Sequence, residues 1–263
     1  RKLFTKKIII ISREPNMIKF SLRYSSYSLV LKILHKLLLP TADKVIVNSK
    51  AMYKDLSKRG IKENKLALVH NPIDHLNIRK VTNFSRHAGN GLRLITVGRL
   101  VKQKGLDRLI PILKNLKNVH LTILGEGSEY DNLINLVKSL NLESKVDFKG
   151  YIENPNSLIA GADYFLLPSR WEGLPNAALE SLVLGTPVIS FKEVEGLVDI
   201  FPYVETNNLY LCQDEYDMEQ LLKHLPSRPD YKNLSLRENL LSKFNTPFQY
   251  SKKITILLKG LVF

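Results

Sequence analysis

Short apolar runs alternate with longer amphipathic stretches over most of the chain. The apolar runs after residue 91 predict strands at Leu92–Val97, His120–Leu124, Val146–Phe148, Tyr164–Leu167 and Pro187–Ser190. The stretches between them repeat apolar residues at helical spacing and predict helices at Leu106–Leu116, Glu129–Ser139, Asn156–Ala160 and Ala177–Leu184. Strands that are apolar throughout, each followed by a helix, indicate a parallel sheet covered on both faces. We therefore expect a Rossmann-like α/β domain.

The first part of the chain follows the same alternation less regularly. It predicts strands at Lys7–Ser12, Lys44–Val47 and Leu66–Val69, and helices at Ser28–Leu39 and Ala51–Arg59. The helix at Ser28–Leu39 carries an apolar stripe, which is typical of packing against a core, while contact with a membrane surface is the alternative. Because a Rossmann-like domain usually exceeds about 100 residues, we expect residues 1–78 to be a partial, N-terminally truncated domain.

The best candidate for a domain boundary is a polar segment without clear periodicity. Residues 79–91 end in Gly89-Asn90-Gly91 and are predicted to be a linker. Residues 92–245 would then form the complete C-terminal domain. The tail, residues 246–263, is weakly amphipathic and is predicted to be a C-terminal helix that returns to the first domain.

Charge is distributed unevenly. The first 90 residues hold 19 Lys and Arg against 5 Asp and Glu, a balance of +14 that equals the net charge of the whole chain. Such a face favours anionic partners: phospholipid headgroups, nucleic acid or a phosphate-bearing substrate. Nucleic acid is disfavoured because no nucleic-acid-binding motif accompanies the charge. A lysine-rich surface that is merely solvated is the alternative.

Cysteine content and hydropathy constrain the class of protein. Cys212 is the single cysteine, so no intrachain disulfide can form and nothing indicates an oxidising compartment. The apolar runs of the sequence are shorter than the roughly 18 residues that a membrane-spanning helix needs. We therefore expect a cytoplasmic protein.

Candidate chemistry follows the predicted strands, because ligands of parallel α/β sheets lie beyond the carboxyl ends of the strands. Gly98 and Arg99 come directly after one strand, and Lys104 precedes the next helix. Gly98 permits a close turn, Arg99 can make a bidentate contact and Lys104 supplies a point charge. Together these groups suit the binding of a diphosphate. A structural turn with solvated lysines is the alternative.

A second candidate segment follows the strand Tyr164–Leu167. Pro175 favours the first turn of a helix, whose amides at Asn176 and Ala177 have no intrahelical partner and can bind an anionic or sugar oxygen. Glu172 precedes that turn and Glu180 lies inside the helix. Carboxylates accept hydrogen bonds from sugar and ribose hydroxyls, although an anion at a helix N-terminus and a surface charge are the simpler interpretation.

The segment PSRWEGLPNAALESLVLGTPVI resembles the signature of glycosyltransferase family 4, or glycosyltransferase group 1. Members of this family are retaining enzymes with the GT-B fold. Glu172 and Glu180 match the family's Glu-x7-Glu motif in register, and VGRLVKQKGLDRLI resembles its phosphate-binding segment. ILGEGSEYDNL, ADKVIVNSKAMYKDL and VHNPID also resemble the family, so that the likeness covers roughly residues 42–190. It implies a GT-B type α/β fold, with a donor domain and a partial acceptor domain.

The resemblance implies a role for each matching residue. Arg99 and Lys104 would bind the donor diphosphate and stabilise the leaving group, and Glu172 would hold a hydroxyl of the donor sugar; these three are the candidate catalytic residues. Glu180 would hold the ribose, and Tyr151 would lie near the base. The full set of candidate donor-binding residues is Gly98, Arg99, Lys104, Tyr151, Glu172, Leu174, Asn176, Ala177 and Glu180. Many family members carry a histidine after the strand matching Lys7–Ser12, and here either Glu14 replaces it or the alignment slips.

The implied function is a retaining hexosyltransferase of surface polysaccharide or glycolipid assembly. Its donor would be a nucleoside-diphosphate sugar, with a UDP-sugar favoured over a GDP-sugar, and its acceptor a glycan or a lipid phosphate. We expect no cofactor and no metal ion, and a cytoplasmic location that extends to the inner face of the cell membrane. Two alternatives stay open: a truncated, non-catalytic nucleotide-sugar binding module, and a GT-B sugar-nucleotide epimerase.

Overall fold

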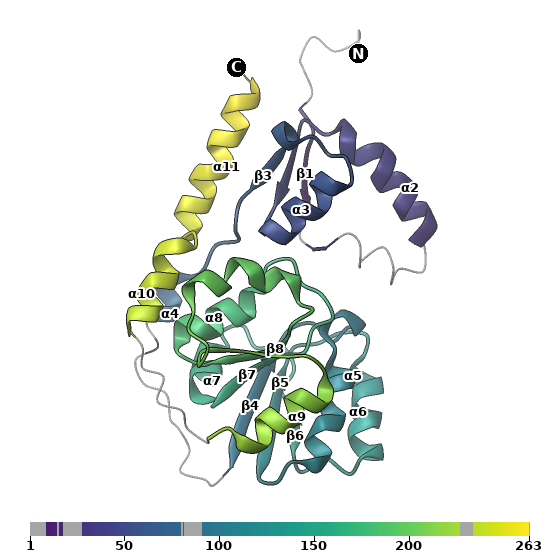
Figure 1. Cartoon of the computed structure of the whole chain (residues 1–263), viewed down its shortest axis with the longest axis vertical. Coiled ribbons are helices and arrows are strands. Elements are labelled where there is room, and N and C mark those ends of the chain that lie inside the picture. Colours follow the sequence, from purple (N-terminus) through teal and green to yellow (C-terminus); the bar gives the residue numbers. More distant parts are fainter. Residues whose placement is uncertain are drawn as a thin grey trace.

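The protein consists of two α/β units joined end to end (Figure 1). The computed structural model describes residues 9–14, 16–17, 28–79, 81, 91–226 and 234–262. Each unit is built on one parallel sheet, as the alternation of apolar runs and amphipathic stretches predicts. Most of the predicted linker, residues 79–91, lies outside the described residues, so the domain boundaries stay predictions.

The first unit has a three-stranded parallel sheet with the order β1-β2-β3. Its elements are β1 (Ile11–Glu14), α2 (Ser28–Leu38), β2 (Lys44–Val47), α3 (Lys50–Lys58) and β3 (Leu66–Leu68). Ser49 starts α3 as its N-cap, because the side chain accepts a hydrogen bond from the amide of Met52. The strand predicted at Lys7–Ser12 is displaced toward the C-terminus, and its first two residues lie outside the described part.

The second unit has a six-stranded sheet in which every pair is parallel. Its strands, in the spatial order β6-β5-β4-β7-β8-β9, are Val146–Phe148, Val119–Leu124, Leu92–Val97, Tyr164–Leu167, Val188–Phe191 and Leu209–Cys212. From β4 the chain adds β5 and β6 toward one edge of the sheet, and it then returns to add β7, β8 and β9 toward the other edge. The strand order therefore reverses between β4 and β7. Such a reversal opens a crevice at the carboxyl ends of the strands.

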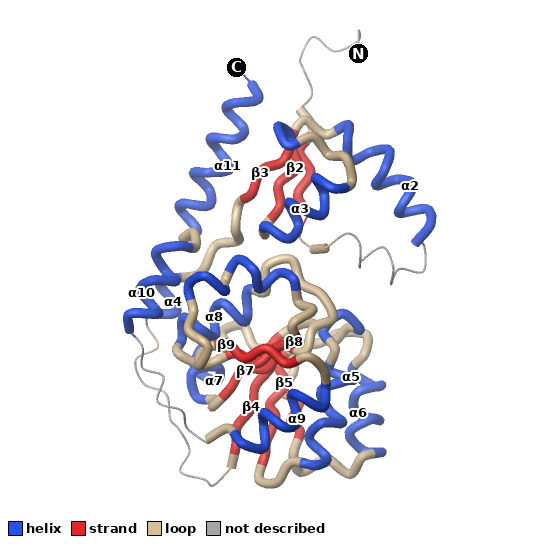
Figure 2. Tube along the Cα trace, viewed as in Figure 1, coloured by secondary structure: helices blue, strands red, loops and turns tan. Residues whose placement is uncertain are grey.

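Helices cover both faces of this sheet (Figure 2). They are α4 (His75–Arg79), α5 (Leu106–Leu109), α6 (Tyr130–Ser139), α7 (Asn156–Gly161), α8 (Asn176–Leu184), α9 (Glu215–His224) and α10 (Leu234–Lys243), whereas α11 (Pro247–Val262) extends away from this sheet. One hydrophobic core lies between the sheet and α5, α6 and α9, and includes Cys212. A second lies between the sheet and α7, α8 and α10. The continuous apolar strands are explained by burial from both sides.

The helix predicted at Leu106–Leu116 is only partly correct. The α-helical hydrogen bonding of α5 stops at Leu109, and a 3-10 helix continues from Ile110 to Asn115. Pro111 explains the change, because proline has no amide hydrogen and its ring collides with the preceding helical turn.

Helix α2 does not pack against a core, although its apolar stripe is typical of such packing. Six of its apolar side chains stay between 43% and 69% exposed: Leu29, Val30, Ile33, Leu34, Leu37 and Leu38. Within the described residues, the interpretation as a helix buried on a core is therefore wrong. Helical spacing fixes that the apolar residues share a face, but only the neighbouring elements decide whether that face is covered.

The C-terminal segment runs back along the first unit (Figure 1). The side-chain amide of Asn245 donates to the carbonyl of His70 at 2.8 Å. The guanidinium of Arg13 lies 6.0 Å from the ring centre of Tyr250 in α11. Both contacts join the end of the chain to the first unit, at β1 and at the residues that follow β3.

Candidate functional site

Residues beyond the strands of the two sheets meet each other across the junction of the units. Asn16, just after β1, donates its side-chain amide to Gln103 at 3.0 Å, and Gln103 follows β4. Asn71, just after β3, donates to Asn176 at the start of α8 at 3.2 Å. The candidate site is thus assembled from the carboxyl ends of both parallel sheets.

Glu172 is the centre of the best-defined cluster. This residue is only 6% exposed. One carboxylate oxygen, Oε1, accepts from Nζ of Lys104 at 2.7 Å and from the hydroxyl of Ser169 at 2.7 Å. The other lies 3.4 Å from the amide nitrogen of Gln103. A cation and neutral donors around a buried carboxylate hold it in one orientation.

Gly98 belongs to the same cluster. A methyl group built on Gly98 would lie 3.1 Å from Cε of Lys104, so the lysine side chain passes close over the glycine. The structure therefore brings Gly98, Lys104 and Glu172 together, although they come from two loops about 70 residues apart.

The loop that carries Glu172 is held from several sides. Arg170 forms a two-pronged ion pair with Asp107, at 2.8 and 2.9 Å. Trp171 is buried in the hydrophobic core of the first unit, although it comes from the second. Gly196 packs directly on the carbonyl of Gly173, which a methyl group at Gly196 would meet at 2.0 Å. The position of Glu172 therefore depends on both units.

The first turn of α8 offers open backbone amides. Pro175 precedes the helix and provides no side-chain capping hydrogen bond, so the amides of Asn176 and Ala177 keep no partner within the helix. Such amides, at the positive end of a helix, bind oxygen anions. Leu174 is buried in the core beneath the helix, so that only its backbone can contact a ligand.

Glu180 lies one turn further along α8, in a neighbouring polar cavity of about 520 Å³. Asp74, Glu153 and Asn156 line this cavity with it. Burial, together with the nearby charge of Asp74, raises the pKa of Glu180 to about 7. Glu172 does not line this cavity. The two carboxylates of the motif therefore occupy adjacent sites along α8 instead of one shared pocket.

Arg99 and Tyr151 are exposed at the carboxyl ends of β4 and β6. The guanidinium of Arg99 forms no ion pair with any residue in the described part of the chain. Tyr151 is 71% exposed and comes two residues before Glu153 in the Glu180 cavity. The structure thus places Arg99 near Gly98 in the chain and Tyr151 near the Glu180 cavity, but not against Glu172.

Several site residues were missed by the sequence analysis. Gln103 and Ser169 lie inside the two candidate loops, and their amide and hydroxyl groups were the signal that could have identified them. Asp74 follows the turn at Asn71-Pro72, but nothing in the sequence places it beside Glu180. The carboxylate of Glu14 accepts from Ser12 at 2.9 Å, and Glu14 lines a cavity between β1 and α2.

The described part of the chain holds neither a metal-binding cluster nor a membrane-spanning helix. No group of three or more His, Cys, Asp or Glu side chains is arranged there to hold a metal ion. None of the described helices has the length and apolar content to cross a bilayer.

Comparison with known sequences gives a consistent picture. The family model described as "Glycosyl transferases group 1" matches residues 77–229, more than half of the chain. A relative from Campylobacter jejuni, "N-acetylgalactosamine-N,N'-diacetylbacillosaminyl-diphospho-undecaprenol 4-alpha-N-acetylgalactosaminyltransferase", is 35% identical over 212 residues, covering 78% of this chain and 58% of that protein. The chain spans about three fifths of the length of such curated relatives.

Comparison with solved structures supports the fold. Sucrose-phosphate synthase from Thermosynechococcus elongatus matches with a TM-score of 0.79 at 20% identity, covering 98% of this chain and 69% of that one. HepE from Anabaena, solved in complex with UDP, matches with a TM-score of 0.72 at 20% identity, covering 96% of this chain and 72% of that one. The expected GT-B type α/β fold is confirmed.

Proposed function

Because the chain belongs to the glycosyl transferases group 1 family, we propose that it transfers a hexose from a nucleoside-diphosphate sugar to a glycan or lipid-linked acceptor of surface polysaccharide assembly. The observation that carries this proposal is the buried Glu172, held by Lys104 and Ser169 next to the open amides of α8. An acceptor of hydrogen bonds beside a cation and a helix N-terminus suits a sugar joined to a diphosphate.

In the proposed reaction, the diphosphate binds between Lys104, Arg99 and the amides of Asn176 and Ala177. These groups stabilise the negative charge that develops on the leaving diphosphate. Glu172 accepts a hydrogen bond from a hydroxyl of the donor sugar and fixes its orientation. The anomeric bond breaks on the face that the acceptor then attacks, and the leaving phosphate takes the acceptor's proton, so that configuration is retained. Cationic side chains do the work that a metal ion does in other transferases.

The nucleoside would occupy the cavity around Glu180. Its carboxylate would accept hydrogen bonds from the ribose hydroxyls, and Tyr151, two residues before Glu153 of this cavity, would contact the base. UDP is the preferred nucleotide, which is supported by the structural similarity to HepE, whose solved complex contains UDP. The Campylobacter relative acts on a diphospho-undecaprenol compound by its name, which supports a lipid-linked acceptor here.

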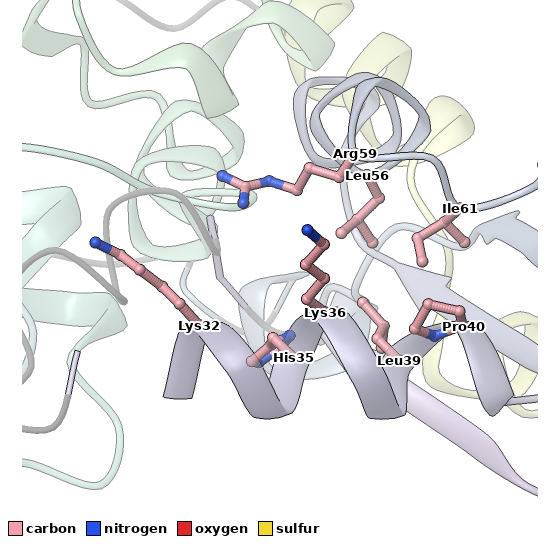
Figure 3. Close-up of a pocket in the computed structure, with 8 residues that line it drawn as sticks. All are labelled: Lys32, His35, Lys36, Leu39, Pro40, Leu56, Arg59 and Ile61. Carbon is pink, nitrogen blue, oxygen red and sulfur yellow. The ribbon is translucent and has the colours of Figure 1, made fainter. Parts of the chain in front are cut away.

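A lipid-linked acceptor requires contact with a membrane, and α2 has a suitable surface. One face of this helix is apolar and exposed, and the opposite face lines a pocket of about 350 Å³ between α2 and α3. Lys32 and Lys36 extend into this pocket from α2 and Arg59 from the end of α3, and Leu39 and Leu56 line it from the same two sides (Figure 3). Apolar side chains beside cations are typical of helices that lie in an anionic membrane interface. We assign this surface to the inner, cytoplasmic face of the cell membrane, where nucleotide-sugars are available.

The donor site is tested by a thermal-shift screen of UDP-, GDP- and ADP-sugars. One nucleotide class should stabilise the protein by about 2.7 kcal/mol when the ligand is present at about 100 times its Kd. Arg99→Ala should abolish the shift without lowering the melting temperature of the free protein, because Arg99 is exposed. Lys117→Ala, an exposed cation on the same unit, is the matched control. Equal binding by the Arg99 variant would show that the site is wrongly assigned.

Binding and transfer are separated by a product assay. Mass spectrometry of a reaction with the stabilising sugar nucleotide and a lipid-phosphate acceptor should detect a glycosylated acceptor. Stabilisation without any glycosylated product would select the nucleotide-sugar binding module instead.

A further inference from the structure

A second cationic groove lies on the other flank of α3, across the junction of the two units. Its volume is about 410 Å³. Lys50, Lys54 and Lys58 line it from α3, and Lys192 lines it from the segment after β8. All four side chains are exposed. None of these ammonium groups forms an ion pair with a carboxylate among the residues that the structure describes, and the groove holds four lysines against two acidic residues, Asp55 and Glu195.

This arrangement of lysines is unfavourable for the fold alone. Lys50, Lys54 and Lys58 are spaced four residues apart on one helix, where like charges repel. Lys50 is also the first residue of α3, at the helix end that is already partly positive. Of the two acidic side chains in the groove, Asp55 pairs with Arg59 at 3.1 Å, and Glu195 lies on the side of the second unit, so that the balance of the groove remains positive. A positive cluster that weakens its own helix is explained if it binds an anion.

The opposite wall of the groove contains three apolar residues beside Lys192 and Glu195. Val198 and Phe201 are 46% and 40% exposed, and Val194 lies buried behind them. Lysines bind phosphate as point charges, and the apolar residues of this wall suit a hydrocarbon chain attached to it. A groove of this size holds a headgroup, whereas a nucleic acid would need a longer charged track. We propose that this lysine groove binds the phosphate headgroup of an anionic membrane lipid.

The groove also adjoins the candidate site. Its wall contains Glu195, the residue before Gly196, and Gly196 packs on the carbonyl of Gly173, the residue after Glu172. A lipid phosphate held between α3 and Lys192 bridges the two units and orients the site relative to the membrane. The inference rests on the membrane contact in the proposed function and adds a specific lipid site to it.

The experiment compares the whole chain with two single charge reversals. Lys54→Glu changes the centre of the groove, and Lys114→Glu makes the same change at an exposed lysine of the other unit. Two probes are used: vesicles of phosphatidylcholine with or without phosphatidic acid, and soluble dihexanoylphosphatidic acid, which binds without a membrane. Lys54→Glu should weaken binding to both probes about 30-fold, the effect of removing two unit charges near a lipid phosphate. Lys114→Glu should stay within about twofold of the parent.

Unfolding cannot explain the expected loss. In Lys54→Glu the introduced carboxylate would lie four residues from Lys50 and from Lys58, so the melting temperature of this variant should equal or exceed that of the parent. Equal lipid binding by the two variants would overturn the proposal. So would inorganic phosphate that binds as tightly as dihexanoylphosphatidic acid, because the apolar residues of the wall would then play no part. The shift in melting temperature that the UDP-sugar causes is measured on the same proteins. If the parent and both variants show no such shift while the parent still binds lipid, the proposed function alone is contradicted.

Discussion

The raised pKa of Glu180 allows a quantitative test of the nucleoside site. Burial and the neighbouring charge of Asp74 move this pKa from 4.5 to about 7. The folded protein therefore binds the Glu180 proton more tightly than the unfolded chain does. Stability from this group is fully present below pH 4.5 and is lost as the pH rises toward 7. Glu180→Gln has nearly the same shape and removes the titrating group.

The size of the effect follows from the shift. A difference of about 2.5 pKa units corresponds to about 3 kcal/mol in the free energy of unfolding once Glu180 is ionised in both states. Relative to the parent, the Gln variant should therefore gain about 3 kcal/mol between pH 4.5 and pH 8. Urea unfolding of both proteins across this range measures the gain.

Nucleotide binding should change in the opposite direction. Ribose hydroxyls donate best to an ionised carboxylate, so the affinity of the parent for the UDP-sugar should rise from about pH 6 to about pH 8. The Gln variant should bind more weakly at the higher pH, by about 1.5 to 3 kcal/mol, because it lacks hydrogen bonds to a charged acceptor. Isothermal titration calorimetry measures both. A variant that is stabilised at high pH and still binds as tightly as the parent would refute the role of Glu180 in the donor site.

Two further predictions concern the junction between the units. Trp171→Ala should lower the free energy of unfolding by about 3 to 5 kcal/mol, because it empties a site in the core of the first unit. Trp171 is the single tryptophan, so the emission of the parent should be that of a buried indole, and a fully solvated emission maximum in the native protein would contradict the contact. Asp199→Asn should cost about 1 to 3 kcal/mol, because the buried carboxylate accepts from the amide of Lys50 and pairs with His70, both at 2.8 Å. Unchanged urea unfolding of this variant would show that the contacts of Asp199 with Lys50 and His70 contribute nothing to stability.

The alternation of apolar runs and amphipathic stretches was sufficient to predict the parallel α/β architecture. When a sheet is buried on both faces, each of its strands is apolar throughout and can be recognised by itself. All four residues of Tyr164–Leu167 are buried, for example. The loops that follow the strands could be selected for the same reason, because the carboxyl ends of parallel strands always meet at one edge. Gly98, Lys104 and Glu172 were chosen in this way and lie together in the structure.

The remaining features depend on contacts between segments that are far apart in the sequence. Local periodicity places the apolar residues of α2 on one face but carries no information about what covers that face. Trp171 packs in the other unit, and burial together with the charge of Asp74, more than 100 positions away, raises the pKa of Glu180. Burial and pairwise charge energies depend on distances in space, which spacing along the chain does not specify. Tertiary structure alone therefore separated the two motif carboxylates into adjacent sites and assembled the lysine groove from both units.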